Sequence, residues 1–362
     1  MTKLLIASRP DDTHAHFVKL AMEKYGHSVD ILYPADFPSQ LTHSLYIKNN
    51  KFSWQADGKD CELQQTDYDV VWYRRPLKPF IPNYIHPDDL YNVKKENNLF
   101  AQNLWRVIFP NTVWINPVNA SINTNCKLLQ LKIADNCQLK IPNTLISNDP
   151  TEIKFFIVAN EAKVIYKTIH PMAWYEDNCL SLTYADDIAI TDLPSDPILQ
   201  VTPGIYQRKI PKDHELRITY MGDRYIAVKI DSQAHELAKA DWRYAPTKQL
   251  SLEQVSLPKS IDQACREMMQ KLGIVFGCFD FIVTPDGEYY FLEVNEQGQF
   301  LWIEDVNPDI KLLQPFIEFV TNINHSNKII RPMHVALSDF NMQAQHCLKH
   351  AIENHINPPL YN

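Results

Sequence analysis

The stretch that decides the fold is CFDFIVTPDGEYYFLEVN, residues 278–295. Two apolar runs flank Asp286-Gly287, a dipeptide typical of tight hairpin turns. We therefore predict an antiparallel hairpin with strands over 278–284 and 288–295.

Two carboxylates are expected to face each other across this hairpin. If Asp286-Gly287 is the whole loop, Asp280 pairs directly with Glu293, and the two side chains lie about 5 Å apart on one face. Asn295 lies two residues further on and shares that face. A slip of one residue, which Pro285 beside the turn could cause, would break this pairing. The other face would be the core face, with Phe279, Phe281, Val283, Tyr290, Leu292 and Val294.

The facing carboxylates need a compensating charge, because they repel each other and lose solvation in an apolar hairpin. Three oxygen-bearing side chains, two of them anionic, suit Mg²⁺, which takes its remaining ligands from water and substrate phosphates. A solvated sheet face, or a pair bridged by Lys or Arg, is the alternative interpretation.

Three cationic residues upstream also stand at unusual places. Lys167 ends the apolar run 164–166, where it could bind a phosphate or extend to solvent from the strand end. Lys127 lies early in a helix predicted over 125–137, as a phosphate ligand or as ordinary surface charge. Arg217 faces away from the core side of its strand, either as a phosphate clamp, which its forked guanidinium suits, or simply exposed.

The rest of the chain indicates an α/β opening followed by antiparallel structure. Strands over 3–8, 29–32 and 69–73, with a helix over 11–25, predict a small domain with a parallel sheet. Further on, residues 216–230 predict a hairpin whose two-residue loop is Gly222-Asp223.

Composition excludes several classes of protein. Only 8 of the 362 residues are glycine, against roughly 25 at average usage, and neither a dinucleotide-binding G-x-G-x-x-G nor a P-loop is present. The net charge of −8 argues against a bulk nucleic-acid binder. No apolar stretch approaches the ~20 residues of a membrane span, and the start is too short in its apolar run for a signal peptide. Seven scattered cysteines without C-x-x-C fit reduced thiols in a cytoplasmic protein.

In chain order these residues form a pattern that resembles the ATP-grasp superfamily. The pattern is Lys127, Lys167, QRKI (207–210), ELR (215–217), Asp280 and Glu293-x-Asn295. Three further segments look like those of the microviridin-type peptide ligases, or graspetide synthetases. They are VWYRRP (71–76), DWR (241–243) and FLEVNEQGQFLWIE (291–304).

The resemblance implies a fold of mixed α/β and α+β class. A pre-ATP-grasp α/β domain over 1–115 would precede a two-subdomain ATP-grasp fold. Its central subdomain would span 116–206 and its C-terminal subdomain, with the metal site, 207–325. Residues 326–362 would form a tail with a last helix.

The resemblance also implies a role for each matched residue. Lys127 and Lys167 would bind the α- and β-phosphates of ATP. Asp280, Glu293 and Asn295 would hold two Mg²⁺ ions. The adenine would be framed by Gln207, Lys209 and Ile210, and the ribose would be bound by Asp213. Arg217 and Arg243 would stabilise the γ-phosphate and the acyl phosphate.

The implied activity is that of an ADP-forming carboxylate–amine or carboxylate–alcohol ligase that works through an acyl phosphate. Its substrate would be a ribosomally made precursor peptide with a leader and acidic core residues, crosslinked through side-chain amides or esters. Alternatives are a ligase that adds an amino acid to a protein or small-molecule carboxylate, and a non-catalytic nucleotide-binding scaffold. A homodimer is compatible with the resemblance and with the frequency of such oligomers. Many relatives close over the phosphates with a glycine-rich loop, whereas residues 168–178 here contain no glycine.

Overall fold

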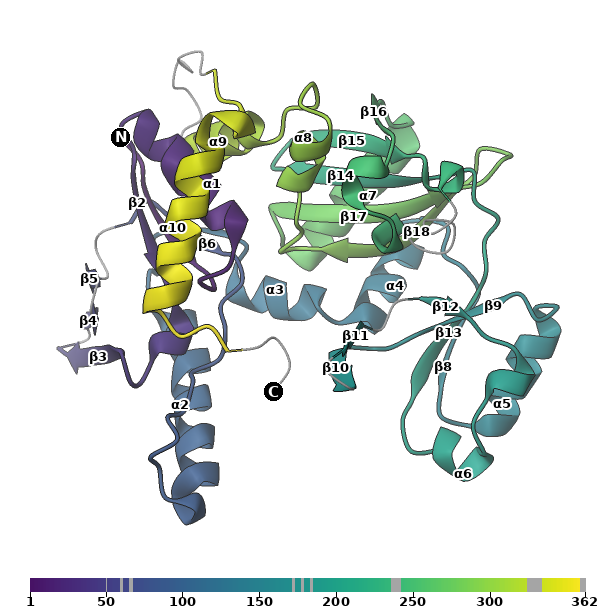
Figure 1. Ribbon diagram of the computed structural model, residues 1–362, viewed down its shortest axis with the longest axis horizontal. Helices are drawn as coiled ribbons and strands as arrows, with labels where there is room; N and C mark the ends of the chain where they lie inside the picture. The colour runs from purple at the N-terminus through teal and green to yellow at the C-terminus, as the bar shows by residue number, and fades with distance from the viewer. Residues whose placement is uncertain are drawn as a thin grey trace.

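The computed structural model describes residues 1–49, 51–58, 61–64, 68–170, 173–176, 179–182, 185–235, 242–323 and 334–358. Figure 1 shows an N-terminal α/β unit on one side of the molecule and, on the other side, a central unit below the C-terminal sheet. The last helix returns to the N-terminal unit. No helix in these ranges is both long and apolar enough to cross a bilayer.

The N-terminal unit contains the predicted parallel sheet. Its strand order is β2-β1-β6-β7, and all three pairings are parallel. The strands are β1 (Lys3–Ala7), β2 (Ser28–Leu32), β6 (Val70–Tyr73) and β7 (Val113–Ile115), with helices α1 (Thr13–Lys24) and α2 (Pro87–Val107). Between β2 and β6 the chain forms a separate antiparallel sheet of β3 (Leu41–Lys48), β4 (Lys51–Gly58) and β5 (Cys61–Gln64), which the sequence did not reveal.

The central unit begins with two short helices and continues into a four-stranded sheet of order β12-β9-β13-β8. The helices are α3 (Val118–Thr124), α4 (Lys127–Asn136), α5 (Pro150–Ala159) and α6 (Asp196–Leu199). The strands are β8 (Thr144–Ser147), β9 (Val164–Lys167), β12 (Asp186–Asp187) and β13 (Gly204–Arg208), together with a separate hairpin of β10 (Ala173–Glu176) and β11 (Cys179–Leu182). The expected boundary between residues 206 and 207 falls inside β13, so the domain ranges remain a prediction.

The C-terminal unit is an antiparallel sheet of order β16-β15-β14-β17-β18. Its strands are β14 (His214–Met221), β15 (Arg224–Ile230), β16 (Leu252–Val255), β17 (Phe276–Val283) and β18 (Tyr289–Asn295). Met221 pairs with Arg224, which leaves Gly222-Asp223 as the predicted loop. Helix α7 (Lys259–Leu272) packs its apolar side onto one face of this sheet.

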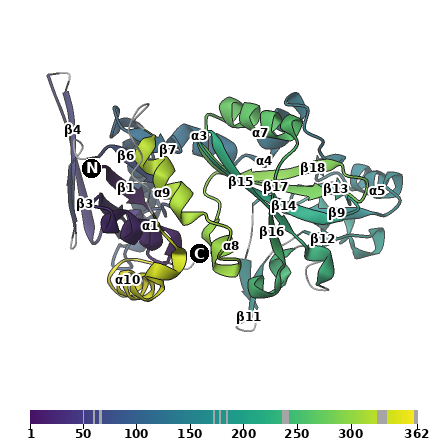
Figure 2. The ribbon, with the colours of Figure 1, turned by 90° about the horizontal axis from the view of Figure 1, so that it is seen from above.

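The remaining helices connect this sheet to the N-terminal unit. Helices α8 (Leu301–Val306) and α9 (Leu313–Asn322) follow β18, and α10 (Asn341–Asn354) packs against α1 (Figures 1 and 2). One core cluster runs through β1, β6, β17, α8 and α9, so the two units share a continuous apolar interior. Short 3₁₀ turns are η1 (Pro34–Asp36), η2 (Ile190–Asp192), η3 (Ser232–Ala234), η5 (Trp242–Tyr244), η6 (Thr247–Gln249) and η7 (Leu337–Phe340).

The β17–β18 hairpin has the predicted carboxylate pairing but not the predicted turn. Asp280 pairs with Glu293, whereas nearer the turn Val283 pairs with Tyr289. The Thr284 amide donates to the Glu288 carbonyl at 3.0 Å, so the loop has three residues, Pro285 to Gly287. Gly287 has a φ of +83°, a conformation that glycine adopts without strain. A β-bulge then leaves Leu292 unpaired and returns the register to the predicted one.

This bulge overturns part of the predicted core face. Phe291 pairs with Phe281, and both side chains are fully buried in the core under α7. Tyr290 and Leu292, predicted for that face, are only half-buried and lie outside this cluster. The shift of one residue on the turn side of the bulge moves the alternating pattern to the other face.

Candidate active site

A row of three charged residues crosses the sheet on the face opposite α7. Arg217 of β14 pairs with Asp280 of β17, which in turn pairs with Glu293 of β18. The Arg217 Nη1 and Asp280 Oδ2 atoms are 2.6 Å apart. Three adjacent strands thus place one cation and two anions side by side, because alternate residues of a strand point to the same face.

Arg217 is buried, so the alternative that this arginine is simply exposed to solvent is wrong. Its exposed fraction is 6%. Nη2 donates a hydrogen bond to the Gln299 carbonyl at 3.0 Å, and Nε has no partner among the described residues. The guanidinium therefore links the carboxylate row to the loop that follows β18.

The two carboxylates respond differently to this environment. Burial raises the pKa of Asp280, and the charge of Glu293 adds to the rise against the opposing effect of Arg217. Burial also acts to raise the pKa of Glu293, but Lys127, Arg243 and Lys167 outweigh it, so this pKa is lowered. The row thus keeps its second negative charge only with the help of cations from other elements.

Those cations come from the central unit and from η5. The Lys127 Nζ atom, at the start of α4, lies 4.0 Å from Glu293 Oε2 and donates to the Thr168 carbonyl at 3.4 Å. Lys167 is the last residue of β9, and its charge reaches Glu293. The structure therefore brings Lys127, Lys167, Arg217, Arg243, Asp280 and Glu293 together, although they span more than 160 residues of sequence.

Asn295 completes the set predicted to bind a metal. It lies at the end of β18, is exposed, and its Oδ1 accepts a hydrogen bond from the Gln297 amide at 3.0 Å. Across the described ranges, no group of three or more His, Cys, Asp or Glu residues is arranged to bind a metal. Two carboxylates and an amide oxygen suit Mg²⁺ that takes its other ligands from water and phosphates, and suit a self-sufficient metal cage poorly.

The strand expected to frame the adenine is shorter than predicted. β13 ends at Arg208, so Lys209 and Ile210 lie just beyond it. Gln207 is buried, its Nε2 donates to Thr144 Oγ1 at 2.9 Å, and its Oε1 has no partner among the described residues. An acceptor of this kind fits the amino group of a purine.

Two residues that were expected to bind the adenine and the ribose contact other side chains of the protein. Lys209 forms an exposed ion pair with Asp187 at 2.6 Å. Asp213 lies 2.7 Å from His214 Nδ1, and this hydrogen bond lowers the pKa of the Asp213 carboxyl. Their roles with adenine and ribose remain predictions.

The tryptophans of two quoted sequence segments stack on each other. The rings of Trp242, in η5, and Trp302, in α8, have centroids 4.7 Å apart and an interplanar angle of 19°. Arg243 is exposed and adjoins this stack. Asp241, the first residue of the DWR segment, lies outside the described residues, as do parts of 168–178.

Gly298 allows the loop after β18 to approach the sheet closely. A Cβ at this position would lie 2.5 Å from the Cys278 Sγ atom and 3.0 Å from the Asn295 carbonyl oxygen. A side chain would therefore push the loop away from the residues that follow Glu293. In a chain poor in glycine, this one is required by packing.

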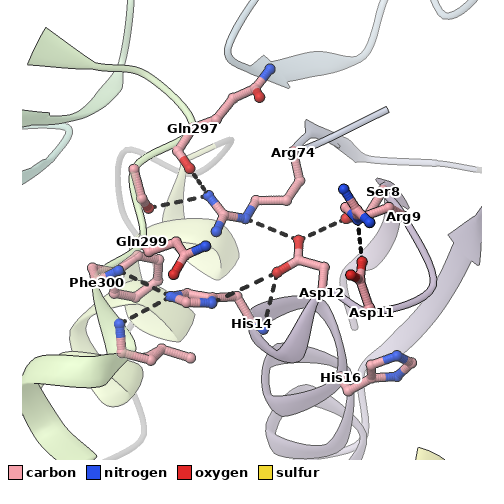
Figure 3. A network of polar contacts seen from close by, with 12 residues as sticks. Ser8, Arg9, Asp11, Asp12, His14, His16, Arg74, Gln297, Gln299 and Phe300 are labelled. Atoms are coloured by element: carbon pink, nitrogen blue, oxygen red, sulfur yellow. Dashed lines mark hydrogen bonds and ion pairs between the residues drawn. The ribbon is translucent and has the colours of Figure 1, made fainter. Parts of the chain in front are cut away.

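A buried network that sequence reasoning missed holds this loop from the N-terminal unit (Figure 3). Asp12 accepts hydrogen bonds from Arg74 Nε at 3.2 Å and from Ser8 Oγ at 2.7 Å. Arg74 Nη1 donates to the carbonyls of Gln297 and, at 3.1 Å, Gly298. Burial opposes ionisation of Asp12, but Arg74 and the other neighbours outweigh it and lower its pKa to about 2.

His14 holds the next two residues of the same loop. Its Nε2 accepts hydrogen bonds from the amides of Phe300 at 3.0 Å and Leu301 at 3.1 Å. Burial and the nearby charge of Arg74 lower the His14 pKa to about 3, which keeps the ring neutral and Nε2 free to accept. The polar run after β1 and the segment VWYRRP were visible in the sequence, but only tertiary structure shows what they contact.

Comparison with solved structures gives this arrangement a context. An ATP-grasp ligase from Chryseobacterium gregarium, associated with a RiPP and solved with ADP and a leader and core peptide, is similar at 26% identity and TM-score 0.80, covering 91% of this chain and 100% of that one. The macrocyclase MdnC of Microcystis aeruginosa MRC, bound to precursor peptide MdnA, is similar at 29% identity and TM-score 0.77, covering 89% and 100%. The macrocyclase MdnB of the same organism shares the fold at 24% identity and TM-score 0.74, covering 90% and 99%.

These likenesses confirm the predicted resemblance to ATP-grasp ligases and to the microviridin-type macrocyclases among them. They also confirm the fold class and the enzyme class, an ADP-forming ligase. No family model matched the sequence, and no curated protein did.

Proposed function

We propose that this chain, an ATP-grasp ligase by fold, uses ATP to join side chains within a ribosomally made peptide. The observation that supports this most is the buried row Arg217–Asp280–Glu293 with Lys127 4.0 Å from its outer carboxylate. Anions for a metal and cations for phosphates meet there, at the junction of the central and C-terminal sheets. Mg-ATP carries both kinds of group in one molecule.

The residues of the row then have separate tasks. Asp280, Glu293 and Asn295 would hold Mg²⁺, two ions in our proposal, which when bound neutralise charge on the phosphates. Lys127 and Lys167 would bind the α- and β-phosphates, while Gln207, Lys209, Ile210 and Asp213 would hold the nucleoside. Arg217 would keep Asp280 in place, and its unpartnered Nε, with Arg243, would stabilise the transferred phosphoryl group.

The reaction would proceed in two steps. A substrate carboxylate attacks the γ-phosphorus, ADP leaves, and an acyl phosphate forms. An amine or hydroxyl of the same peptide then attacks the acyl carbon, phosphate departs, and the nucleophile loses a proton. The product is a side-chain amide or ester, and no covalent enzyme intermediate is required.

The substrate class is suggested by the two neighbours above 25% identity, which were solved with a leader and core peptide or with a precursor peptide. We extend this to a precursor with Asp or Glu in its core, and to a homodimer as the working form of the enzyme. The alternatives are a ligase that adds an amino acid to a protein or small-molecule carboxylate, and a scaffold that binds nucleotide without turnover.

Calorimetry and product analysis test the proposal together. Mg-ADP should bind the wild-type protein, and a precursor peptide with Asp or Glu in its core should lose one water mass for each ADP released. ADP release with free amino acids as acceptors, but without dehydration of any peptide, would favour the first alternative. Absence of Mg-ADP binding would refute every nucleotide-dependent version.

A further inference from the structure

The chain that follows α10 is fastened to the N-terminal unit. Residues 355–357, which we call the strap, leave the end of α10 and contact η1, which follows β2. Asp36 Oδ1 accepts a hydrogen bond from the Ile356 amide at 2.8 Å, and Asp36 Oδ2 lies 2.7 Å from His355 Nδ1. The His355 ring also packs on the Tyr33 ring, with centroids 4.2 Å apart. The strap therefore has a defined position relative to β2.

The last residue of the strap contacts a buried arginine. Arg9 Nη2 donates to Asn357 Oδ1 at 3.2 Å. Arg9 Nε pairs with Asp11, as Figure 3 shows. The exposed fraction of Arg9 is 3%, and its Nη1 has no partner among the described residues. Because a buried guanidinium without acceptors is costly, both Asp11 and Asn357 help to decide where this side chain lies.

Arg9 begins the turn that carries the loop-holding network. Its carbonyl accepts a hydrogen bond from the Asp12 amide at 3.2 Å, which closes the turn between β1 and α1. Asp12 binds Arg74, and Arg74 binds carbonyls 297 and 298 of the loop after β18. A continuous series of polar contacts thus connects the strap to this loop. The series runs through the N-terminal unit, whereas the lysines assigned to the phosphates belong to the central unit.

Fastening α10 to the body does not require the Asn357 side chain. Helix α10 packs on α1, and Asp36 binds both residues of the strap that precede Asn357. The Asn357 side chain instead contacts the turn at the carboxyl end of β1. What it adds is the position of Arg9.

We infer that Asn357 is a positioning residue of the ligase: it holds Arg9, and through Arg9 the turn at 9–12 from which the loop at 297–301 is held. The inference rests on the proposed function for the reaction whose rate is affected. Arg217 binds carbonyl 299 of this loop, so a displaced turn would disturb the carboxylate row. A displacement of about 1 Å can slow a preorganised reaction by up to about 100-fold.

Variants of the full chain test this inference, with a precursor peptide that has Asp or Glu in its core as the substrate. N357A removes an acceptor from Arg9 and should lower kcat for ADP formation about tenfold, while the KM for ATP stays within about twofold of the wild-type value. N357D keeps an oxygen acceptor at the same place and should restore most of kcat. N341A changes an exposed asparagine at the other end of α10 and should have no effect.

A double-mutant cycle tests whether the strap acts as one unit. D36A frees the strap from η1 and should lower kcat as N357A does. The N357A substitution should then change kcat less than about twofold in the D36A background, because both act through the same contact with Arg9. Additive losses, a wild-type kcat in N357A, or a loss that N357D fails to restore would each overturn the inference.

Hydrogen exchange gives a readout that does not depend on the reaction. The amides of Phe300 and Leu301, which donate to His14, should exchange at least about threefold faster in N357A than in the wild type or in N341A. Mass spectrometry of a peptide that contains residues 297–301 measures this. Unchanged exchange would refute the connection between the strap and the loop. If the wild type forms no ADP with any peptide, the proposed function fails, and the exchange measurement still decides whether Asn357 positions the loop.

Discussion

The molecule contains two buried Arg–Asp pairs that bind the same loop and differ in how well their charges are compensated. Arg74 with Asp12 binds carbonyls 297 and 298, and Arg217 with Asp280 binds carbonyl 299. The pKa of Asp12 is lowered to about 2, whereas that of Asp280 is raised. Asp12 has an arginine, a hydroxyl and a neutral histidine around it, whereas Asp280 faces a second carboxylate.

This difference separates a structural site from a functional one. The Asp12 network is nearly complete as it stands and rigidly positions the loop. The Asp280 row has two carboxylates side by side, and burial together with the charge of Glu293 keeps the pKa of Asp280 raised despite Arg217, which is the kind of perturbed group that functional sites show. Substitutions in the Asp280 row and in the Asp12 network should therefore have different effects on activity and on stability.

The largest effect is expected from E293Q on activity. Removing this carboxylate should reduce ADP formation about 1,000-fold or more, equivalent to roughly 4 kcal/mol of transition-state stabilisation. The free energy of unfolding should fall modestly, because the lowered pKa of Glu293 means that the surrounding cations stabilise its charged form in the folded protein. E288Q is the matched control, since Glu288 forms an exposed pair with Lys140 just before the same strand. Normal turnover by E293Q would refute the metal assignment.

The next largest effect is expected from D12N on stability. It leaves Arg74 buried without its counter-charge, so the free energy of unfolding should fall by about 3 kcal/mol in urea titrations. Asn serves as well as Asp at a helix N-cap, so the cap of α1 is kept. D149N changes the exposed N-cap of α5 in the same way and should cost under about 0.5 kcal/mol. Equal costs for the two variants would show that Asp12 acts only as a cap.

The neutral His14 makes stability depend on pH. Its pKa is about 3 when folded, against 6.5 for a free histidine, so the unfolded chain binds the proton first. Stability is therefore complete above pH 6.5 and is lost as the pH falls from there toward 3, by up to about 1.4 kcal/mol for each pH unit. The free energy of unfolding of H14Q should therefore fall less than that of the wild type between pH 6.5 and pH 3. H346Q, on the exposed side of α10, should follow the wild-type pH dependence. Parallel curves for wild type and H14Q would contradict a neutral buried ring.

The smallest effect is expected from the tryptophan stack beside the carboxylate row. W302L should lower the free energy of unfolding by about 1 kcal/mol through loss of the aromatic pair, whereas W302F should keep most of it. We expect the loss in ADP formation, expressed as activation free energy, to exceed the loss in free energy of unfolding, because Arg243 adjoins Trp242 and its charge reaches Glu293. If the stack had only a structural role, the loss in free energy of unfolding would be the larger of the two.

Several features of the site could be predicted because they follow from local rules. Hairpin spacing placed Asp280 opposite Glu293, although the loop was one residue longer than predicted and the bulge at Leu292 cancelled the error. The positions of Lys127 and Lys167 also agreed, because each begins or ends an element whose apolar pattern is clear. The buried state of Arg217 could not be predicted, since alternation tells which face a residue is on but not what covers that face.

The amino-acid sequence by itself determined the elements that carry the site, the ligand chemistry and the order of charged residues along the chain. These depend on near neighbours, whose spacing fixes faces and turns. Only the tertiary structure decided that Asp12, His14 and Arg74 would hold the loop at 297–301. Those facts depend on contacts between residues more than 200 positions apart, and the compensation of a buried charge is set by everything packed around it.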